Sequence, residues 1–125
     1  MTVSGIVIHG DGFGKKLGYP TANIDRDEYQ EKGLDLAYGV YAGVVTRGNG
    51  DQYMAGMVVG PEDSTGLPKL EAHLLDFDGD LYGERLVFEI GDFLRPFENY
   101  ETIDEIKAAI TTDIATIRKL SLLDT

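Results

Sequence analysis

Several features that define other protein classes are missing from this sequence of 125 residues. It has no cysteine, which excludes disulfides, zinc–thiolate sites and a cysteine nucleophile. It has no run of about 18 apolar residues, the length that a transmembrane helix needs. The first residues, MTVSGIVIHGDG, have no basic segment before their short apolar stretch, so we expect no secretory signal. These absences favour a protein of the cytoplasm.

Basic residues are also scarce. There are 11 Lys and Arg against 22 Asp and Glu, which gives a formal net charge of −11. A protein that grips nucleic acid through its phosphates, or docks on an anionic membrane, needs clustered basic residues. We therefore expect no nucleic-acid partner and no membrane partner. The charge still permits a nucleotide substrate, provided that a divalent cation accompanies it.

Glycine, by contrast, is abundant, with 16 residues placed mostly between apolar runs. Such spacing favours many turns and a β-rich fold. We expect strands at 3–9, 38–46, 52–59, 70–77 and 81–90, with a further extended segment at 19–24. An Asn-Gly turn and a tight Asp-Gly-Asp turn predict two hairpins, 38–46 with 52–59 and 70–77 with 81–90. Loops are expected at 10–18, 25–36 and 60–69.

The end of the chain follows a helical pattern. From Thr102 onward, apolar residues recur at spacings of three and four, which predicts a helix with one apolar face. Thr102 and Glu105 form a Thr-x-x-Glu capping box that marks its start. We expect this helix to seal the core over an open side of the β-structure rather than to bind a partner. About six short strands followed by one helix indicate a small antiparallel barrel, a single domain over 1–125 that acts as a monomer.

The glycine-rich segment at 10–18, GDGFGKKLG, is a candidate phosphate site, because backbone N–H groups free of side chains can point at phosphate oxygens. Two standard patterns fail here. His9 stands where the P-loop needs its first glycine, and Lys15 occupies the third glycine position of the dinucleotide-binding pattern. A surface connection with no ligand remains the alternative.

Thr21 and Asn23 are two residues apart, so in an extended segment their side chains point the same way. A hydroxyl and an amide carbonyl are both neutral oxygen ligands, and Mg²⁺ commonly takes few protein ligands beside substrate phosphates and water. The alternative is that both residues satisfy a turn.

Glu71, on the expected strand 70–77, is a candidate general base for a hydroxyl nucleophile. The alternative for Glu71 is a glutamate that faces solvent. His73 is a candidate metal ligand or base, or else a structural histidine. The run DFDGD at 76–80 resembles a calcium loop but has Val87 where the bidentate glutamate belongs, so we expect a turn. Around Arg95, the aromatic segment DFLRPFENY (92–100) suits either a lid over a planar ligand or a structural pin between strand and helix.

Together these segments resemble the riboflavin kinase (flavokinase) family. HGDGFGKKLGYPTANI (9–24) resembles the family's glycine-rich flap and Pro-Thr-Ala-Asn signature, and YGVYAG (38–43) resembles the strand that follows. LEAHLLDFDGDLYGERL (70–86) resembles its Glu-x-His strand and hairpin. FLRPFENYETIDEIKAAITTDIATIRKL (93–120) resembles its second flap and closing helix. The resemblance spans nearly the whole chain, in the family's order.

This resemblance implies a six-stranded antiparallel Greek-key barrel with a C-terminal helix. It also implies phosphorylation of the riboflavin 5′-hydroxyl by ATP with Mg²⁺, giving FMN and ADP. Gly10, Gly14 and Lys15 are the implied contacts to the ATP phosphates. Thr21 and Asn23 are the implied ligands of the Mg²⁺ that those phosphates share.

For the acceptor, the resemblance implies that Glu71 activates the riboflavin hydroxyl and that Arg95, with its flap, covers the flavin. Two other functions stay open, a non-catalytic flavin- or nucleotide-binding barrel and a protein-interaction module. The chain is expected to be either a stand-alone kinase or a fragment of a bifunctional protein, and its initial methionine favours the first.

Overall fold

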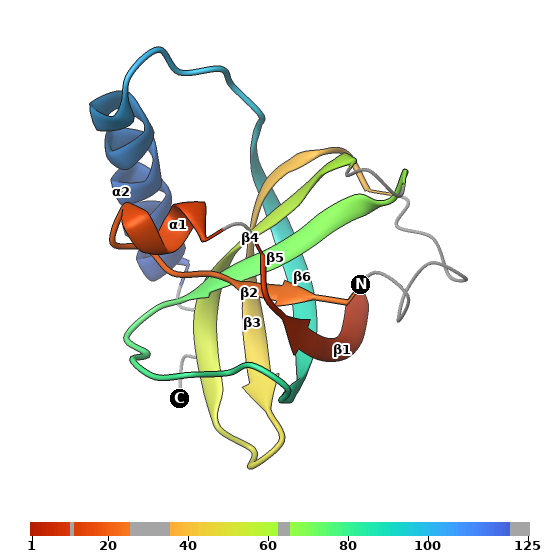
Figure 1. The fold of residues 1–125 in the computed structure, drawn as a ribbon. Coiled ribbons are helices and arrows are strands. Elements are labelled where there is room, and N and C mark those ends of the chain that lie inside the picture. The colour runs from red at the N-terminus through yellow and green to blue at the C-terminus, as the bar shows by residue number, and fades with distance from the viewer. Residues whose placement is uncertain (11, 26–35, 63–65, 121–125) are drawn as a thin grey trace.

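The computed structural model describes residues 1–10, 12–25, 36–62 and 66–120. Its elements run in the order β1 Thr2–Ile8, α1 Phe13–Lys16, β2 Ala22–Ile24, β3 Gly39–Arg47, β4 Gln52–Glu62, β5 Pro68–Leu74, β6 Arg85–Pro96 and α2 Ile103–Lys119. The strands form a barrel, and α2 lies against its outside (Figure 1). No helix of the described segments is long and apolar enough to cross a membrane.

The barrel is closed and antiparallel throughout, with the strand order β1-β2-β5-β4-β3-β6. β2 pairs with β5 rather than with β3, and β6 returns to lie between β1 and β3. Two of the five consecutive strand pairs, β2 with β3 and β5 with β6, are therefore not neighbours in the barrel, as in a Greek key. The predicted six-stranded antiparallel barrel with a C-terminal helix is confirmed.

Alternation along the strands decides which side chains fill the barrel. On β5, Leu70, Ala72 and Leu74 belong to the buried core, so the intervening Glu71 and His73 lie on the outer face. On β2, Ala22 and Ile24 belong to the same core. Thr21 and Asn23 therefore share the outer face with Glu71 and His73.

The two predicted hairpins have different outcomes. β3 and β4 pair from Thr46–Gln52 back to Gly39–Val59, which confirms the first. The second is wrong, because β5 pairs with β2 and β4 whereas β6 pairs with β1 and β3. A connection over 75–84 replaces the expected tight turn and carries β6 across the barrel.

Loop boundaries also differ from the expectation. The segment 10–18 contains the short helix α1. Its many glycines argued against a helix, because glycine has a low helix propensity. Leu17, directly after α1, is buried at 7% exposure, and this burial favours the helix. The expected loop at 60–69 is shorter, since β4 runs to Glu62 and β5 begins at Pro68. Most of the loop expected at 25–36 lies outside the described residues.

Helix α2 begins as the sequence predicts, with the Thr102 side chain accepting a hydrogen bond from the backbone N–H of Glu105. It packs on the outer face of the barrel, where Ile117 joins Ala42 and Leu75 in a second apolar cluster. The expectation that it seals an open side is wrong, because the strands close the barrel without it. Only Ile117 is buried along α2, which leaves much of its inner face to line a cavity.

Candidate functional site

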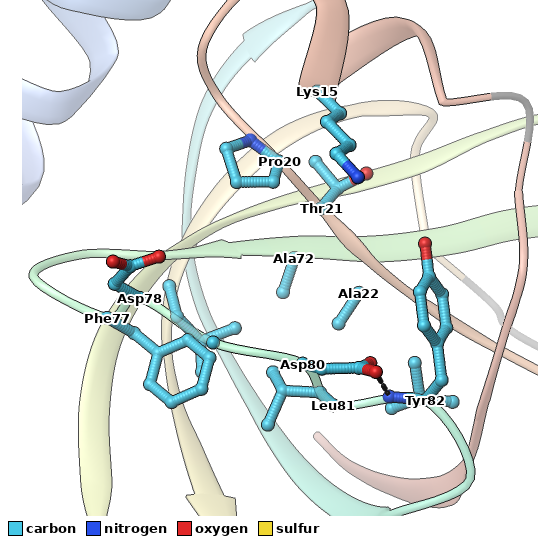
Figure 2. A pocket seen from close by; sticks show the side chains of 13 residues that line it. Lys15, Pro20, Thr21, Ala22, Ala72, Phe77, Asp78, Asp80, Leu81 and Tyr82 are labelled. Atoms are coloured by element: carbon cyan, nitrogen blue, oxygen red, sulfur yellow. Dashed lines mark hydrogen bonds between the residues drawn. The ribbon is translucent and has the colours of Figure 1, made fainter.

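A cavity of about 390 Å³ opens at one end of the barrel. We call it the mouth cavity; it is lined by Val7, Lys15, Pro20, Thr21, Ala22, Ala72, Leu74, Phe77, Asp78, Gly79, Asp80, Leu81 and Tyr82. In Figure 2, Lys15 extends from α1 beside Thr21, and the 75–84 connection forms the opposite wall. Asp80 accepts a hydrogen bond from the Tyr82 backbone N–H at 2.9 Å, which fixes the bend of that wall. One lysine and two aspartates are thus the charged groups of this cavity among the residues described.

A second cavity, also of about 390 Å³, lies between the outer face of β4 and β5 and helix α2. We call it the helix cavity. Its floor includes Val58 and Glu71, and α2 contributes Ile106, Ile110 and Ile114. The connection between β6 and α2 adds Phe97 and Tyr100 to its rim. Five charged side chains, Lys69, Glu71, Arg95, Glu98 and Asp113, also line it. A concave site with apolar and aromatic walls and convergent polar groups suits a small organic ligand.

Thr21 lines both cavities. The neighbouring Asn23 pairs with Glu71 across the β2–β5 ladder, which brings an amide and a carboxylate side by side on the outer face. Because β2 is only three residues long, the rest of the segment before it is free to turn toward α1. The β2–β5 ladder therefore brings Asn23 and Glu71 together, whereas Thr21 lines both cavities, Glu71 lines the helix cavity and Asn23 lines neither.

The glycines of the β1–β2 connection make the surroundings of Thr21 and Asn23 compact. A Cβ atom at Gly10 would lie 2.4 Å from Nδ2 of Asn23, closer than side-chain contacts allow. At Gly14, a Cβ would lie 2.6 Å from the carbonyl oxygen of Tyr19 and 3.4 Å from Thr21 Cγ2. Both glycines are thus required for the backbone to approach the Pro-Thr-Ala-Asn segment, and Lys15 follows directly on α1.

Asn23 is the only buried polar side chain in the described part of the chain, at 8% exposure. A buried amide needs a partner, and no hydrogen bond to this one appears among the described residues. Its carbonyl oxygen and the Thr21 hydroxyl form a neutral oxygen set that suits Mg²⁺ beside nucleotide phosphates. No cluster of three or more acidic, histidine or cysteine side chains offers a second metal site in the described segments.

Arg95 lies on the wall of the helix cavity and is held by α2. Its Nη2 and Nε donate to the carboxylate of Asp113 at 2.8 and 3.0 Å, and its guanidinium lies 5.9 Å from the centre of the Tyr100 ring. These hydrogen bonds raise the pKa of the Arg95 guanidinium above its ordinary value. Arg95 therefore joins β6, α2 and the segment between them, as the structural pin between strand and helix requires, and the lid over a planar ligand stays a prediction.

Sequence reasoning missed Asp113 and Tyr82. Asp113 stands three residues after Ile110, a position that the apolar face of α2 would give to a hydrophobic residue. An acidic residue on that face was the available signal. Tyr82 was read only as part of a strand, and its place on the mouth cavity depends on the 75–84 connection.

The structure thus has two cavities that share Thr21 on a small closed β-barrel, and each of them is lined by both acidic and basic side chains. The family model for riboflavin kinase (flavokinase) matches residues 1–121. The chain therefore belongs to the riboflavin kinase family.

Individual relatives agree with this assignment. The chain is 33% identical to human riboflavin kinase over 92% of this chain and 77% of the human protein. It matches the bifunctional riboflavin kinase/FMN adenylyltransferase of Escherichia coli at 33% identity, over 94% of this chain and 37% of that protein. The chain thus spans little more than a third of the bifunctional relatives.

Solved structures show the same fold. The crystal structure of riboflavin kinase from Trypanosoma brucei superposes with a TM-score of 0.62 at 22% identity, over 95% of this chain and 78% of that one. A crystal structure named as a macrolide-efflux protein from Streptococcus pneumoniae gives a TM-score of 0.81 at 28% identity, over 94% of this chain and 38% of that one. The barrel with its outer helix is therefore a fold that other proteins share.

Proposed function

We propose that this protein phosphorylates the 5′-hydroxyl of riboflavin with ATP and releases FMN and ADP. The observation that carries the proposal is the position of Thr21 between two cavities of different character. Phosphoryl transfer needs a donor and an acceptor held on either side of the moving group. Membership of the riboflavin kinase family supports the choice of substrates.

The helix cavity takes the flavin in this proposal. Its apolar floor and the rings of Phe97 and Tyr100 suit a planar heteroaromatic group, and Arg95 adds a cation at the wall. Glu71 lines the same cavity, so a ribityl chain that leads toward Thr21 passes it. The carboxylate accepts the proton of the 5′-hydroxyl as that oxygen attacks the γ-phosphorus.

The mouth cavity takes the nucleotide. Lys15 lines this cavity and neutralises charge on the phosphates. Gly14 lines the helix cavity and Gly10 neither cavity, so in this proposal their backbone N–H groups meet the phosphates from the side of Thr21. As the new P–O bond forms, the bond from the γ-phosphorus to the β,γ-bridging oxygen breaks, and ADP leaves with the negative charge. The proton taken by Glu71 then passes to solvent.

Mg²⁺, when bound with the nucleotide, offsets charge on the transferring phosphoryl group, and Thr21 and Asn23 would hold it. The need for a cation is strong here, since the net charge of −11 repels free ATP and two aspartates line the mouth cavity. We expect nucleotide affinity to fall sharply when EDTA removes divalent ions. Comparable ATP affinity with and without EDTA would contradict this part of the proposal.

One assay tests the reaction: incubation with riboflavin, ATP and MgCl₂, followed by chromatography for FMN. Formation of FMN is the expected result. Quenching of riboflavin fluorescence without FMN would instead indicate a non-catalytic flavin-binding barrel, and neither product nor binding would indicate an interaction module. A single monomer peak in size-exclusion chromatography is expected as well.

A further inference from the structure

His73 lies on the outer face of β5, at the point where its pairing with β2 ends. The last paired residues are Ala22 and Ala72, and one residue further on β5 still pairs with β4 through His73 and Gly56. β2 ends there because Pro20, two residues before Ala22, has no N–H to donate to a ladder. Pro20 thus lies outside the ladder, and no backbone N–H of the described residues is recorded as a donor to its carbonyl.

The His73 side chain supplies a partner for that carbonyl. Its Nδ1 lies 2.8 Å from the carbonyl oxygen of Pro20. A carbonyl oxygen only accepts hydrogen bonds, so Nδ1 carries the hydrogen, and the neutral ring keeps its lone pair on Nε2. The contact thus selects one of the two neutral forms of the imidazole.

Neighbouring groups hold the ring in this orientation. The Tyr19 ring meets it edge to face, with centroids 5.6 Å apart and planes at 85°. The Tyr19 hydroxyl is itself within 3.0 Å of Thr111 Oγ1 on α2. The ring is therefore fixed between β5, the segment before β2 and the helix.

Fixing the Pro20 carbonyl also fixes Thr21, because the peptide unit that joins the two residues is planar. Thr21 is the residue that both cavities share. A rotation of this peptide would reorient the Thr21 N–H and change the backbone path that carries the Thr21 side chain. The His73 hydrogen bond opposes that rotation.

We propose that His73 is a positioning residue, whose Nδ1–H holds the Pro20–Thr21 peptide so that the Thr21 hydroxyl stays at the junction of the two cavities. The proposal rests on the kinase function proposed above. It gives His73 no role in proton transfer, which remains with Glu71. It also replaces the open sequence-based choice between a ligand, a base and an isolated structural histidine.

Three substitutions of His73 separate the effect of its hydrogen bond from the effect of its side-chain size. The amide nitrogen of His73→Asn takes the place of Nδ1, whereas that of His73→Gln takes the place of Nε2, and His73→Leu donates nothing. We expect His73→Leu and His73→Gln to lower kcat by about tenfold or more, in line with the loss of one hydrogen bond that leaves an acceptor unpaired. His73→Asn should keep kcat within about threefold of the wild type. His73 also lines the helix cavity, so riboflavin affinity without nucleotide, measured by fluorescence quenching, is the readout that a direct contact to riboflavin would change. It should stay close to the wild type in His73→Asn and His73→Gln, which keep a polar side chain of similar size.

A spectroscopic measurement tests the hydrogen bond without reference to activity. The chain has 2 histidines, so His9→Gln leaves His73 as the single imidazole. The ¹⁵N resonances of its ring at neutral pH should show hydrogen on Nδ1 and a lone pair on Nε2. Hydrogen on Nε2 alone would overturn the proposal whatever the kinetics show.

The kinetic outcomes are also separable. Equal losses in His73→Asn and His73→Leu, or wild-type kcat in His73→Gln and His73→Leu, would overturn the positioning role and leave the kinase function intact. A wild-type protein that makes no FMN would defeat the proposed function itself, and with it the positioning role. Recovery in His73→Asn alone would support both.

Discussion

The two cavities are of similar volume but differ in what encloses them. The mouth cavity is bounded by the 75–84 connection and by α1, and it contains Lys15, Asp78 and Asp80. The helix cavity is bounded by strands and by α2, and its isoleucine and aromatic side chains stand beside five charged ones, Lys69, Glu71, Arg95, Glu98 and Asp113. The two cavities therefore differ in the isoleucines and aromatic rim of the helix cavity, which suit an aromatic acceptor in the proposed reaction, and not in charge, which both of them carry.

The largest expected effect is on the acceptor side. Glu71→Gln removes the base but keeps the size of the side chain, so kcat should fall by roughly 10²–10⁴-fold. Binding of riboflavin and of nucleotide should change little, because the helix cavity and the mouth cavity keep their shapes. Steady-state rates of FMN formation and separate binding titrations measure the two effects. Glu89→Gln, on the exposed side of β6, is the matched control.

Near-normal turnover in Glu71→Gln would remove the base from the proposed mechanism. A large loss of riboflavin affinity in the same variant would instead assign Glu71 to binding. Either result would change the division of labour between the cavities without changing the fold.

The second expected effect is at the junction. Thr21→Val keeps the shape of the side chain and removes its oxygen, so nucleotide affinity with Mg²⁺ should fall by about 10–100-fold, the usual cost of one contact to a charged group. Riboflavin affinity should stay near the wild-type value. Titrations with and without EDTA measure this, since the difference between wild type and variant should vanish once the divalent ion is gone. Thr116→Val, exposed on α2, is the control.

The local structure around Thr21, Asn23 and Glu71 was predictable from the sequence for a physical reason. They lie on short segments with strong local signals: glycines where the backbone approaches closely, a proline that ends a strand, and alternation that sends Thr21, Asn23 and Glu71 to one face. That Asn23 and Glu71 meet depends on the ladder between β2 and β5, which these local signals do not predict. Their chemical roles stay predictions that the variants above address.

What the sequence did not predict depends on long-range contacts. The tight turn expected at 78–80 assumed that β5 and β6 pair with each other, and local residues cannot reveal that β6 crosses to β1 and β3. The helix was found and its cap was correct, but its role was not, because periodicity shows an apolar face without showing what lies opposite. The contact of Asp113 with Arg95 was not predictable for the same reason, since the two residues are 18 positions apart in the sequence.

A smaller effect is expected at the wall of the helix cavity. Asp113→Asn removes the charge that pairs with Arg95, a contact with side-chain exposures of 22% for Arg95 and 13% for Asp113. The energy of a partly buried ion pair lies between that of an exposed pair and that of a buried pair. Since Arg95 and Asp113 both line the helix cavity, we expect the loss of this pair to lower riboflavin affinity by about fivefold. Nucleotide affinity should be unchanged, which would confirm that this ion pair serves one cavity only. Asp92→Asn, exposed on β6, controls for loss of charge.

The smallest effect is expected where α2 contacts the wall of the mouth cavity. Arg118 donates to both carboxylate oxygens of Asp76 at 2.9 Å, and these hydrogen bonds lower the pKa of Asp76 below its ordinary value of 3.8. Because the pKa of Asp76 is lower in the folded than in the unfolded protein, the ion pair stabilises the fold at any pH above the ordinary pKa. This stabilisation is lost as the pH falls through the pKa of the folded state. Asp76→Asn should therefore lower Tm slightly at neutral pH and not at all in strong acid.

Asparagine is the appropriate replacement because Asp76 has a φ of 62°, a backbone conformation that asparagine tolerates. The ion pair is exposed to solvent, so salt should screen it and reduce the difference in Tm between wild type and variant. Thermal unfolding at neutral and acid pH, in low and high salt, measures this difference. A large loss of FMN formation in Asp76→Asn, with Tm preserved, would contradict the ranking, since it would mean that the helix governs the mouth cavity as well as its own.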